Sequence, residues 1–154
     1  MTEQDLQNVN KWNEIIDKDG FYITVSLPGV LSQTTGYYDQ FFIARQPIEV
    51  LRVSEVHTTA ETAEGSAYLD IEKLTGTTAP GSGTSILASE QYFDLKSTAN
   101  TVSNRENFTG LSSARQLKEN ERLALKDLGT ATLSSLTGVQ VTLYCKYLNK
   151  GGYR

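Results

Sequence analysis

The chain has 154 residues, of which 38% are hydrophobic, and this is enough apolar material for one compact domain. Its formal net charge of -4 argues against a general nucleic-acid binder, and its apolar runs are far shorter than the roughly 20 residues that cross a bilayer. One Cys excludes an intrachain disulfide, and one His leaves few ways to build a zinc site or a nucleophile–base pair. We therefore expect a soluble protein without an export signal, cofactor, metal site or catalytic residue.

The N-terminal segment has a different hydrophobic period from the rest of the chain. Residues 3–17 have the pattern of a short amphipathic helix, with apolar positions at Leu6, Val9, Trp12, Ile15 and Ile16. An isolated helix of this length is marginal in water, so these side chains must pack on something else. We expect residues 1–19 to form a helix or arm that docks on a neighbouring subunit. Docking on the chain's own domain, residues 20–154, is the alternative.

Alternation predicts strands in the segments that follow. Residues 21–27 alternate apolar and polar side chains along much of their length and stop at Pro28-Gly29, which predicts a strand ended by a turn. Residues 30–40 are mostly polar around two tyrosines and predict a long loop. A second apolar run begins at residues 41–44, so we expect another strand there.

A strand is also predicted over residues 48–56. Its apolar positions change phase after Val50, and Val56 then returns to the first phase. One inserted residue, a β-bulge, reconciles the two phases.

The next strand and the loop after it are distinguished by their composition. Residues 67–74 put their apolar side chains on one face, so Asp70 and Glu72 are expected to point to water. Residues 75–84 contain three Gly and one Pro and no bulky apolar side chain. This second segment, the Gly/Thr loop, is expected to be exposed.

The second half of the chain adds further short strands, which decide the fold class. Strands are predicted at residues 86–87, 92–95 and 122–125, and residues 139–147 show the clearest alternation in the chain. About eight short strands with little helix after residue 17 favour an all-β fold. We predict an antiparallel, jelly-roll-like sandwich of about eight strands with a short N-terminal helix or arm.

The residues that could carry chemistry have structural explanations. His57 has no second His and no spaced Cys in sequence reach, so we expect a structural or surface histidine. Cys145 is in phase with Val141 and Leu143 and is expected to face the core. The candidate contact residues lie in predicted loops, where they could grip sugars or partner proteins or simply close the ends of the sandwich. They are Tyr37, Tyr38, Thr77, Thr78 and Pro80.

Five stretches of the chain together resemble small virion structural proteins of tailed bacteriophages. They are Val56–Ala60, Leu69–Gly83, Phe93–Val102, Arg122–Leu125 and Leu136–Val139. The chain departs from the pattern at Asn120-Glu121, where a Gly-Asp turn is expected, and over residues 1–45, which are particular to it.

The resemblance implies a β-sandwich that decorates the capsid, made in the host cytoplasm and located on the virion surface. Its implied partners are itself, often as a homotrimer, and the major capsid protein or neighbouring virion proteins, with no nucleic acid and no membrane. Such a protein needs no catalytic group, because symmetric association supplies avidity. One alternative is a head-fibre or tail-associated module that binds host-surface glycans through aromatic loops. Another is a glycan-degrading sandwich, which needs two carboxylates about 5–9.5 Å apart.

Overall fold

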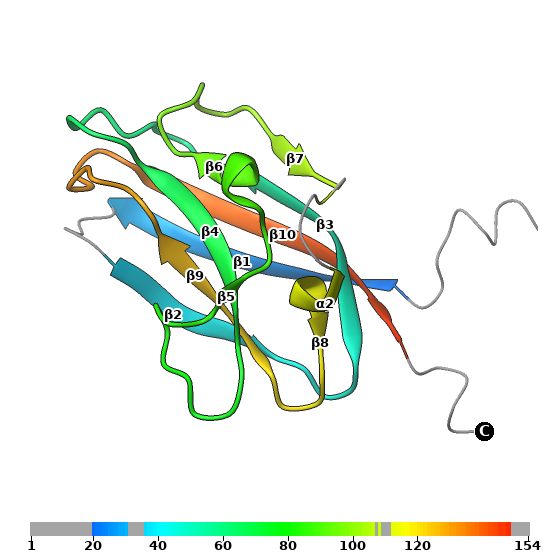
Figure 1. Cartoon of the computed structure of the whole chain (residues 1–154). Coiled ribbons are helices and arrows are strands. Elements are labelled where there is room, and N and C mark those ends of the chain that lie inside the picture. The colour runs from blue at the N-terminus through cyan, green and yellow to red at the C-terminus, as the bar shows by residue number, and fades with distance from the viewer. Residues whose placement is uncertain (1–19, 31–35, 107, 109–111, 149–154) are drawn as a thin grey trace, which may run out of the picture.

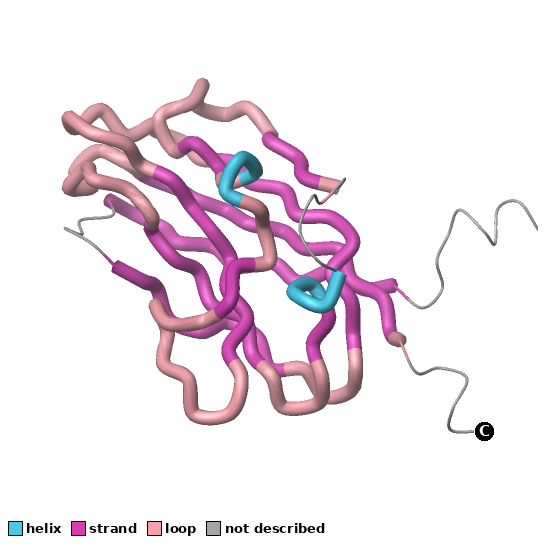
Figure 2. Tube along the Cα trace, viewed as in Figure 1, coloured by secondary structure: helices cyan, strands magenta, loops and turns pink. Residues whose placement is uncertain are grey.

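The computed structural model describes residues 20–30, 36–106, 108 and 112–148, with the backbone alone for Pro28 and residues 36–39. Strands and loops make up nearly all of it, and the two helices are each a single short turn (Figure 2). The strands are β1 (Gly20–Val30), β2 (Gly36–Ile43), β3 (Ile48–Val56), β4 (Tyr68–Leu74), β5 (Thr84–Ser85), β6 (Phe93–Asp94), β7 (Ser103–Arg105), β8 (Gln116–Leu117), β9 (Arg122–Asp127) and β10 (Thr137–Tyr147). The helices are a 3-10 turn at Ser89–Gln91 and α2 at Ser112–Arg115.

The strands form two antiparallel sheets that face each other (Figure 1). One sheet has the order β1-β10-β3-β7, with β8 also paired to β3, and the other has the order β2-β9-β4-β5, with β6 also paired to β4. The short strands β7 and β8 occupy one interrupted edge position, and β5 and β6 occupy another. If each of these two pairs is counted as one strand, the described chain has eight strands, four in each sheet. Numbered along the chain, they lie in the order 1-8-3-6 in one sheet and 2-7-4-5 in the other. This connectivity is a jelly roll, so the predicted fold class is confirmed.

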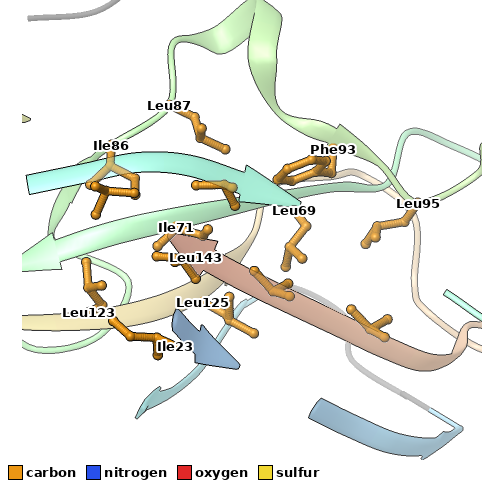
Figure 3. Close-up of a cluster of buried hydrophobic side chains, with 14 of the residues drawn as sticks. Ile23, Leu69, Ile71, Ile86, Leu87, Phe93, Leu95, Leu123, Leu125 and Leu143 are labelled. Carbon is orange, nitrogen blue, oxygen red and sulfur yellow. The ribbon is translucent and has the colours of Figure 1, made fainter. Parts of the chain in front are cut away.

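The core lies between the two sheets. Alternate residues of β10, the central strand of its sheet, are fully buried, and they include Leu143 and Cys145 as the alternation predicted. Figure 3 shows their counterparts from the facing sheet, with Leu69 and Ile71 of β4 beside Leu123 and Leu125 of β9. Each such side chain contributes about 1.5–3 kcal/mol through its removal from water.

Strand β1 is longer than the sequence indicated. The predicted turn at Pro28-Gly29 is wrong, because the strand continues to Val30 through an irregularity after Leu27. Gly29 has a φ of 79°, which glycine adopts without strain. Proline is tolerated here because β1 lies at the edge of its sheet and needs no further N–H donor on its outer side.

Strand β2 also begins earlier than predicted. Residues 36–40 were expected in a loop, but they belong to the strand and pair with β9. The pairing is irregular, because the register shifts both before and after Gln40. Such shifts bend an edge strand and alter which side chains it exposes.

The predicted bulge in β3 is confirmed. Tyr144 pairs with Arg52 and Cys145 pairs with Val50, so Leu51 is the inserted residue. After the bulge the inward positions are Val53, Glu55 and His57, and Val56 does not return to the buried phase. The bulge therefore turns a carboxylate and an imidazole into the interior.

One end of the sandwich, the chain-exit end, carries both ends of the described chain. Gly20 of β1 pairs with Lys146 of β10, and β3 begins opposite the end of β10. Residues 44–47 join the two sheets there. Strand β4 also ends there, because Leu74 pairs with Arg122 beside the end of β2, so the Gly/Thr loop leaves from the same end. Among the described residues no helix has the length and apolarity to cross a membrane.

Candidate functional site

Among the described residues, six acidic or histidine side chains are buried in the sandwich, and they are the main polar groups of its interior. They are Glu55, His57, Glu61, Asp70, Glu72 and Asp127, none more than 5% exposed. Because a buried charge is costly without partners, each must be judged by the groups around it. Within the described part of the chain, no three His, Cys, Asp or Glu residues gather in a way that could hold a metal ion.

Glu61 occupies a nest of backbone N–H groups. Its carboxylate accepts hydrogen bonds of 2.8 to 3.2 Å from the N–H groups of residues 62 and 63 and of residues 134–136. The Ser135 hydroxyl adds a bond of 3.0 Å. Burial would raise the pKa of Glu61, but these N–H groups outweigh it and lower the pKa to about 2. The ionised side chain therefore clamps two loops that are more than 70 positions apart in sequence.

His57 is a structural histidine. Its Nδ1 lies 2.9 Å from Glu55 Oε1, and its Nε2 lies 3.0 Å from the carbonyl oxygen of Ser97. Burial raises the pKa of Glu55, while the hydrogen bond from His57 and the positive charges of His57 and Arg105 offset part of that effect.

Asp70 and Glu72 do not point to water, and that prediction is wrong. Both are almost fully buried, because residues 75–87 return to β4: the Gly/Thr loop packs against Glu72, and Ser85 of the paired strand β5 contacts Asp70. Asp70 accepts from Ser85 Oγ at 2.6 Å and from Ile71 N at 2.7 Å. Burial dominates and raises the pKa of Asp70 to about 6, although both donors stabilise its ionised form.

Glu72 holds the Gly/Thr loop in place. Its carboxylate accepts from the N–H of Gly81 and, at 2.8 Å, from the N–H of Gly83. Lys126 Nζ donates to Gly81 O at 2.9 Å from the neighbouring strand. No side chain fits at Gly83, because a Cβ there would lie 2.5 Å from the carbonyl oxygen of Lys73. The glycines of this loop thus allow the backbone to approach β4 closely.

The candidate contact residues of this loop have mixed environments. Thr77 is exposed, whereas Thr78 and Pro80 are partly buried. The Arg122 guanidinium donates to the carbonyl oxygens of Gly76 and Thr78 at 2.8 and 2.9 Å. These hydrogen bonds hold the loop in one position, so it presents a fixed surface. Its contacts with a partner stay a prediction.

Asp127 and Cys145 complete the buried set. Burial raises the pKa of Asp127, and neither carboxylate oxygen has a hydrogen-bond partner, although the nearby Gly129 N–H offsets part of the shift. Burial raises the pKa of the Cys145 thiol to about 12. A thiol in that state is a core side chain and a poor nucleophile, as the alternation in β10 predicted.

The five stretches on which the expected resemblance to phage virion proteins rests meet in space. The His57 stretch contacts two others: Asn100 N donates to His57 O at 2.8 Å, and Thr58 N donates to Thr137 O at 2.9 Å. These bonds join segments about 40 and 80 positions apart in sequence. The quoted residues thus close one end of the sandwich together.

The remaining two stretches attach through β4. Leu69 of β4 pairs with Phe93 of β6, and Lys73 pairs with Leu123 of β9. All five stretches are therefore linked in one hydrogen-bonded framework. All five stretches contribute residues to strand ends or to the loops beside them.

Several candidate residues cannot be placed. The anchor residues Leu6, Val9, Trp12, Ile15 and Ile16 lie outside the described residues. Tyr37 and Tyr38 lie in strand β2, so their expected place in a loop is wrong, and the structure describes only their backbone. Both tyrosines stay predictions as contact residues.

A cavity of about 430 Å³ lies along the edge strand β2, and we call it the β2 groove. It is lined by Gln40, Phe41, Phe42, Ile43, Arg45 and Arg122. Ile43 is 48% exposed, and Arg45 is exposed as well. Sequence reasoning missed this surface, although three consecutive apolar residues in an edge strand cannot all face the core. That run was the available signal.

Comparisons with known proteins give only distant similarities. No protein-family model matches the chain, and no curated protein matches its sequence. A chain in the structure of infectious bursal disease virus, Gx strain, is 12% identical with a TM-score of 0.46, and the match covers 88% of this chain but only 33% of that one. A chain of the cyanophage Pam1 capsid is 12% identical over 84% of both chains, with a TM-score of 0.44.

A third similar chain comes from Bacillus endospore appendages, described as disulfide-linked pili. It is 8% identical with a TM-score of 0.35, and the match covers 84% of this chain and 88% of that one. The present chain spans about a third of the length of the bursal disease virus chain.

Proposed function

We propose that this chain is a capsid decoration protein of a tailed bacteriophage. In this role it binds the outside of the major capsid shell as a homotrimer and stabilises the shell through repeated subunit contacts. The observation that carries the proposal is the hydrogen-bonded framework: the five stretches that resemble phage virion proteins are joined by it into one jelly roll.

The framework suits a protein that works through fixed surfaces. Glu61 and Glu72 use their carboxylates to tie loops to the sandwich, and the Glu55–His57 pair fixes the end of β3. A loop that is already ordered loses little conformational entropy when it binds a partner. Repetition over a shell then turns a modest contact into firm attachment.

The chain-exit end is the face that we assign to the shell. Residues 1–19, with their apolar positions, leave the sandwich there because Gly20 pairs with Lys146. The Gly/Thr loop leaves from the same end, so Thr77 and its neighbours would touch the shell or an adjacent subunit. The N-terminal segment is the anchor in this arrangement, and the opposite end of the sandwich faces outward.

The anchor is tested by rebinding to phage heads that lack this protein. Trp12→Asp and Ile16→Asp place charges among the apolar anchor positions, and we expect each to weaken binding about tenfold or more. Val102→Asp is the matched control, because Val102 is 59% exposed on the described surface and lies away from the chain-exit end. Equal binding by the anchor variants and the control would contradict the anchor.

The glycan-binding alternative predicts a different result. Tyr37→Ala and Tyr38→Ala should then reduce attachment to host cells without changing attachment to heads. The decoration proposal expects neither variant to change host-cell attachment.

A further inference from the structure

The β2 groove combines three apolar side chains with Gln40 and two arginines. Phe41 and Phe42 pack partly on the core, while Ile43 leaves nearly half of its side chain exposed at the surface. Arg45 and Arg122 supply the positive charge of the lining, and neither makes an ion pair with any carboxylate whose side chain the structure describes. The hydrogen bonds of Arg122 within the described part of the chain go to neutral oxygens of Gln40, Gly76 and Thr78, which do not cancel its charge.

The N-terminal segment has the complementary chemistry. Residues 1–19 contain five acidic residues and two lysines. They also contain the apolar positions Leu6, Val9, Trp12, Ile15 and Ile16. A segment that is both apolar and negatively charged fits a groove that combines apolar side chains with two arginines, in a protein whose net charge is -4.

The segment joins the described part of the chain beside the groove. Gly20 is the first described residue of β1, and the ring of the next residue, Phe21, lies 6.2 Å from the ring of Phe42, which lines the groove. Trp12 is eight positions before Gly20, which the chain spans in about 12 Å as a helix or about 26 Å when extended. An engineered cavity of about 150 Å³ accepts benzene, so the 430 Å³ groove has room for an indole ring.

We propose that, in the free protein, residues 1–19 dock in the β2 groove of the same chain, with Trp12 against its apolar side chains and acidic side chains near Arg45 and Arg122. A covalent link of this length gives the segment a high effective concentration at its own groove. A second copy of the chain, or an unrelated partner, is the competing occupant. The inference concerns the free protein and does not depend on the proposed attachment to a shell.

The test uses Trp12 as the reporter, because it is the only tryptophan in the chain. In the full-length protein we expect blue-shifted emission and acrylamide quenching several-fold weaker than that of free N-acetyltryptophanamide. Ile43→Asp and Arg45→Glu should each shift the emission to the red and raise quenching several-fold. The matched controls are Val102→Asp and Lys118→Glu, which change exposed residues outside the groove and should leave Trp12 shielded.

The outcomes separate the occupants. Shielding that both groove variants reduce, and that does not change on dilution, supports docking in the same chain. Shielding that disappears on dilution assigns the groove to a second copy and overturns the proposal. A solvent-exposed Trp12 in the unmodified protein overturns it too, as does an unchanged Trp12 in either groove variant. Far-ultraviolet circular dichroism identifies any variant that fails to fold, and no phage head is present, so none of these results bears on shell attachment.

Discussion

Glu61 and Asp70 are each only 2% exposed, yet the sandwich shifts the pKa values of their carboxyl groups in opposite directions. Glu61 accepts hydrogen bonds from backbone N–H groups on two loops, and its pKa is lowered to about 2. Asp70 accepts one backbone N–H and one hydroxyl, and burial raises its pKa to about 6. Low solvent exposure alone therefore does not decide the ionisation of a carboxyl group, because the balance between desolvation and the donors around the group does.

The two shifts give opposite dependences of stability on pH. The stability from Glu61 is fully present above its ordinary pKa of 4.5 and is lost as pH falls toward 2. The stability from Asp70 is fully present below its ordinary pKa of 3.8 and is lost as pH rises through about 6. Each shift corresponds to about 3 kcal/mol.

The largest expected effect is at Glu61. Glu61→Gln sets an amide NH₂ against backbone N–H groups that need an acceptor, so we expect the free energy of unfolding at pH 7 to fall by about 3–5 kcal/mol. Urea denaturation measures the loss. Glu64→Gln, at an exposed position nearby, is the matched control and should change stability by less than about 0.5 kcal/mol. A loss at Glu61 as small as that of the control would show that the clamp contributes nothing.

Asp70 is expected to give the next largest effect, with the opposite sign. In the unmodified protein the Asp70 contribution falls by about 3 kcal/mol between pH 4 and pH 7, and Asp70→Asn removes that fall. The free energy of unfolding of the variant should therefore increase steadily, relative to that of the unmodified protein, as pH rises. Urea midpoints measured across this pH range provide the difference. A constant difference at every pH would mean that Asp70 is not the group that titrates.

Glu72 is expected to give the smallest global effect. Its carboxylate ties one loop to its own strand, so Glu72→Gln should lower the free energy of unfolding by about 1–2 kcal/mol. The local effect is larger: amide hydrogen exchange at Gly81 and Gly83 should accelerate about tenfold, while exchange in β10 keeps its rate. If β10 accelerated as much as the loop, Glu72 would be a support of the whole sandwich and the contrast with Glu61 would fail.

The sandwich itself could be predicted because its signals are local. Alternation over residues 139–147 identifies the central strand, and the phase change after Val50 identifies the bulge. Both features depend only on the neighbours of each residue in sequence.

The buried carboxylates could not be predicted, because their partners are distant in sequence. Asp70 and Glu72 alternate with apolar residues as in a strand with one wet face, and nothing in β4 says that residues 75–87 return to contact both carboxylates. Three of the five backbone donors to Glu61 lie more than 70 positions away, at residues 134–136. Alternation reports the period of a strand but not what covers its second face.

The most direct test of the proposed role is to locate the chain on intact phage particles by electron cryomicroscopy. We predict hundreds of copies on the outer surface of the head, each with its chain-exit end toward the shell. A few dozen copies at a fibre or tail, or a chain-exit end that points away from the shell, would contradict capsid decoration.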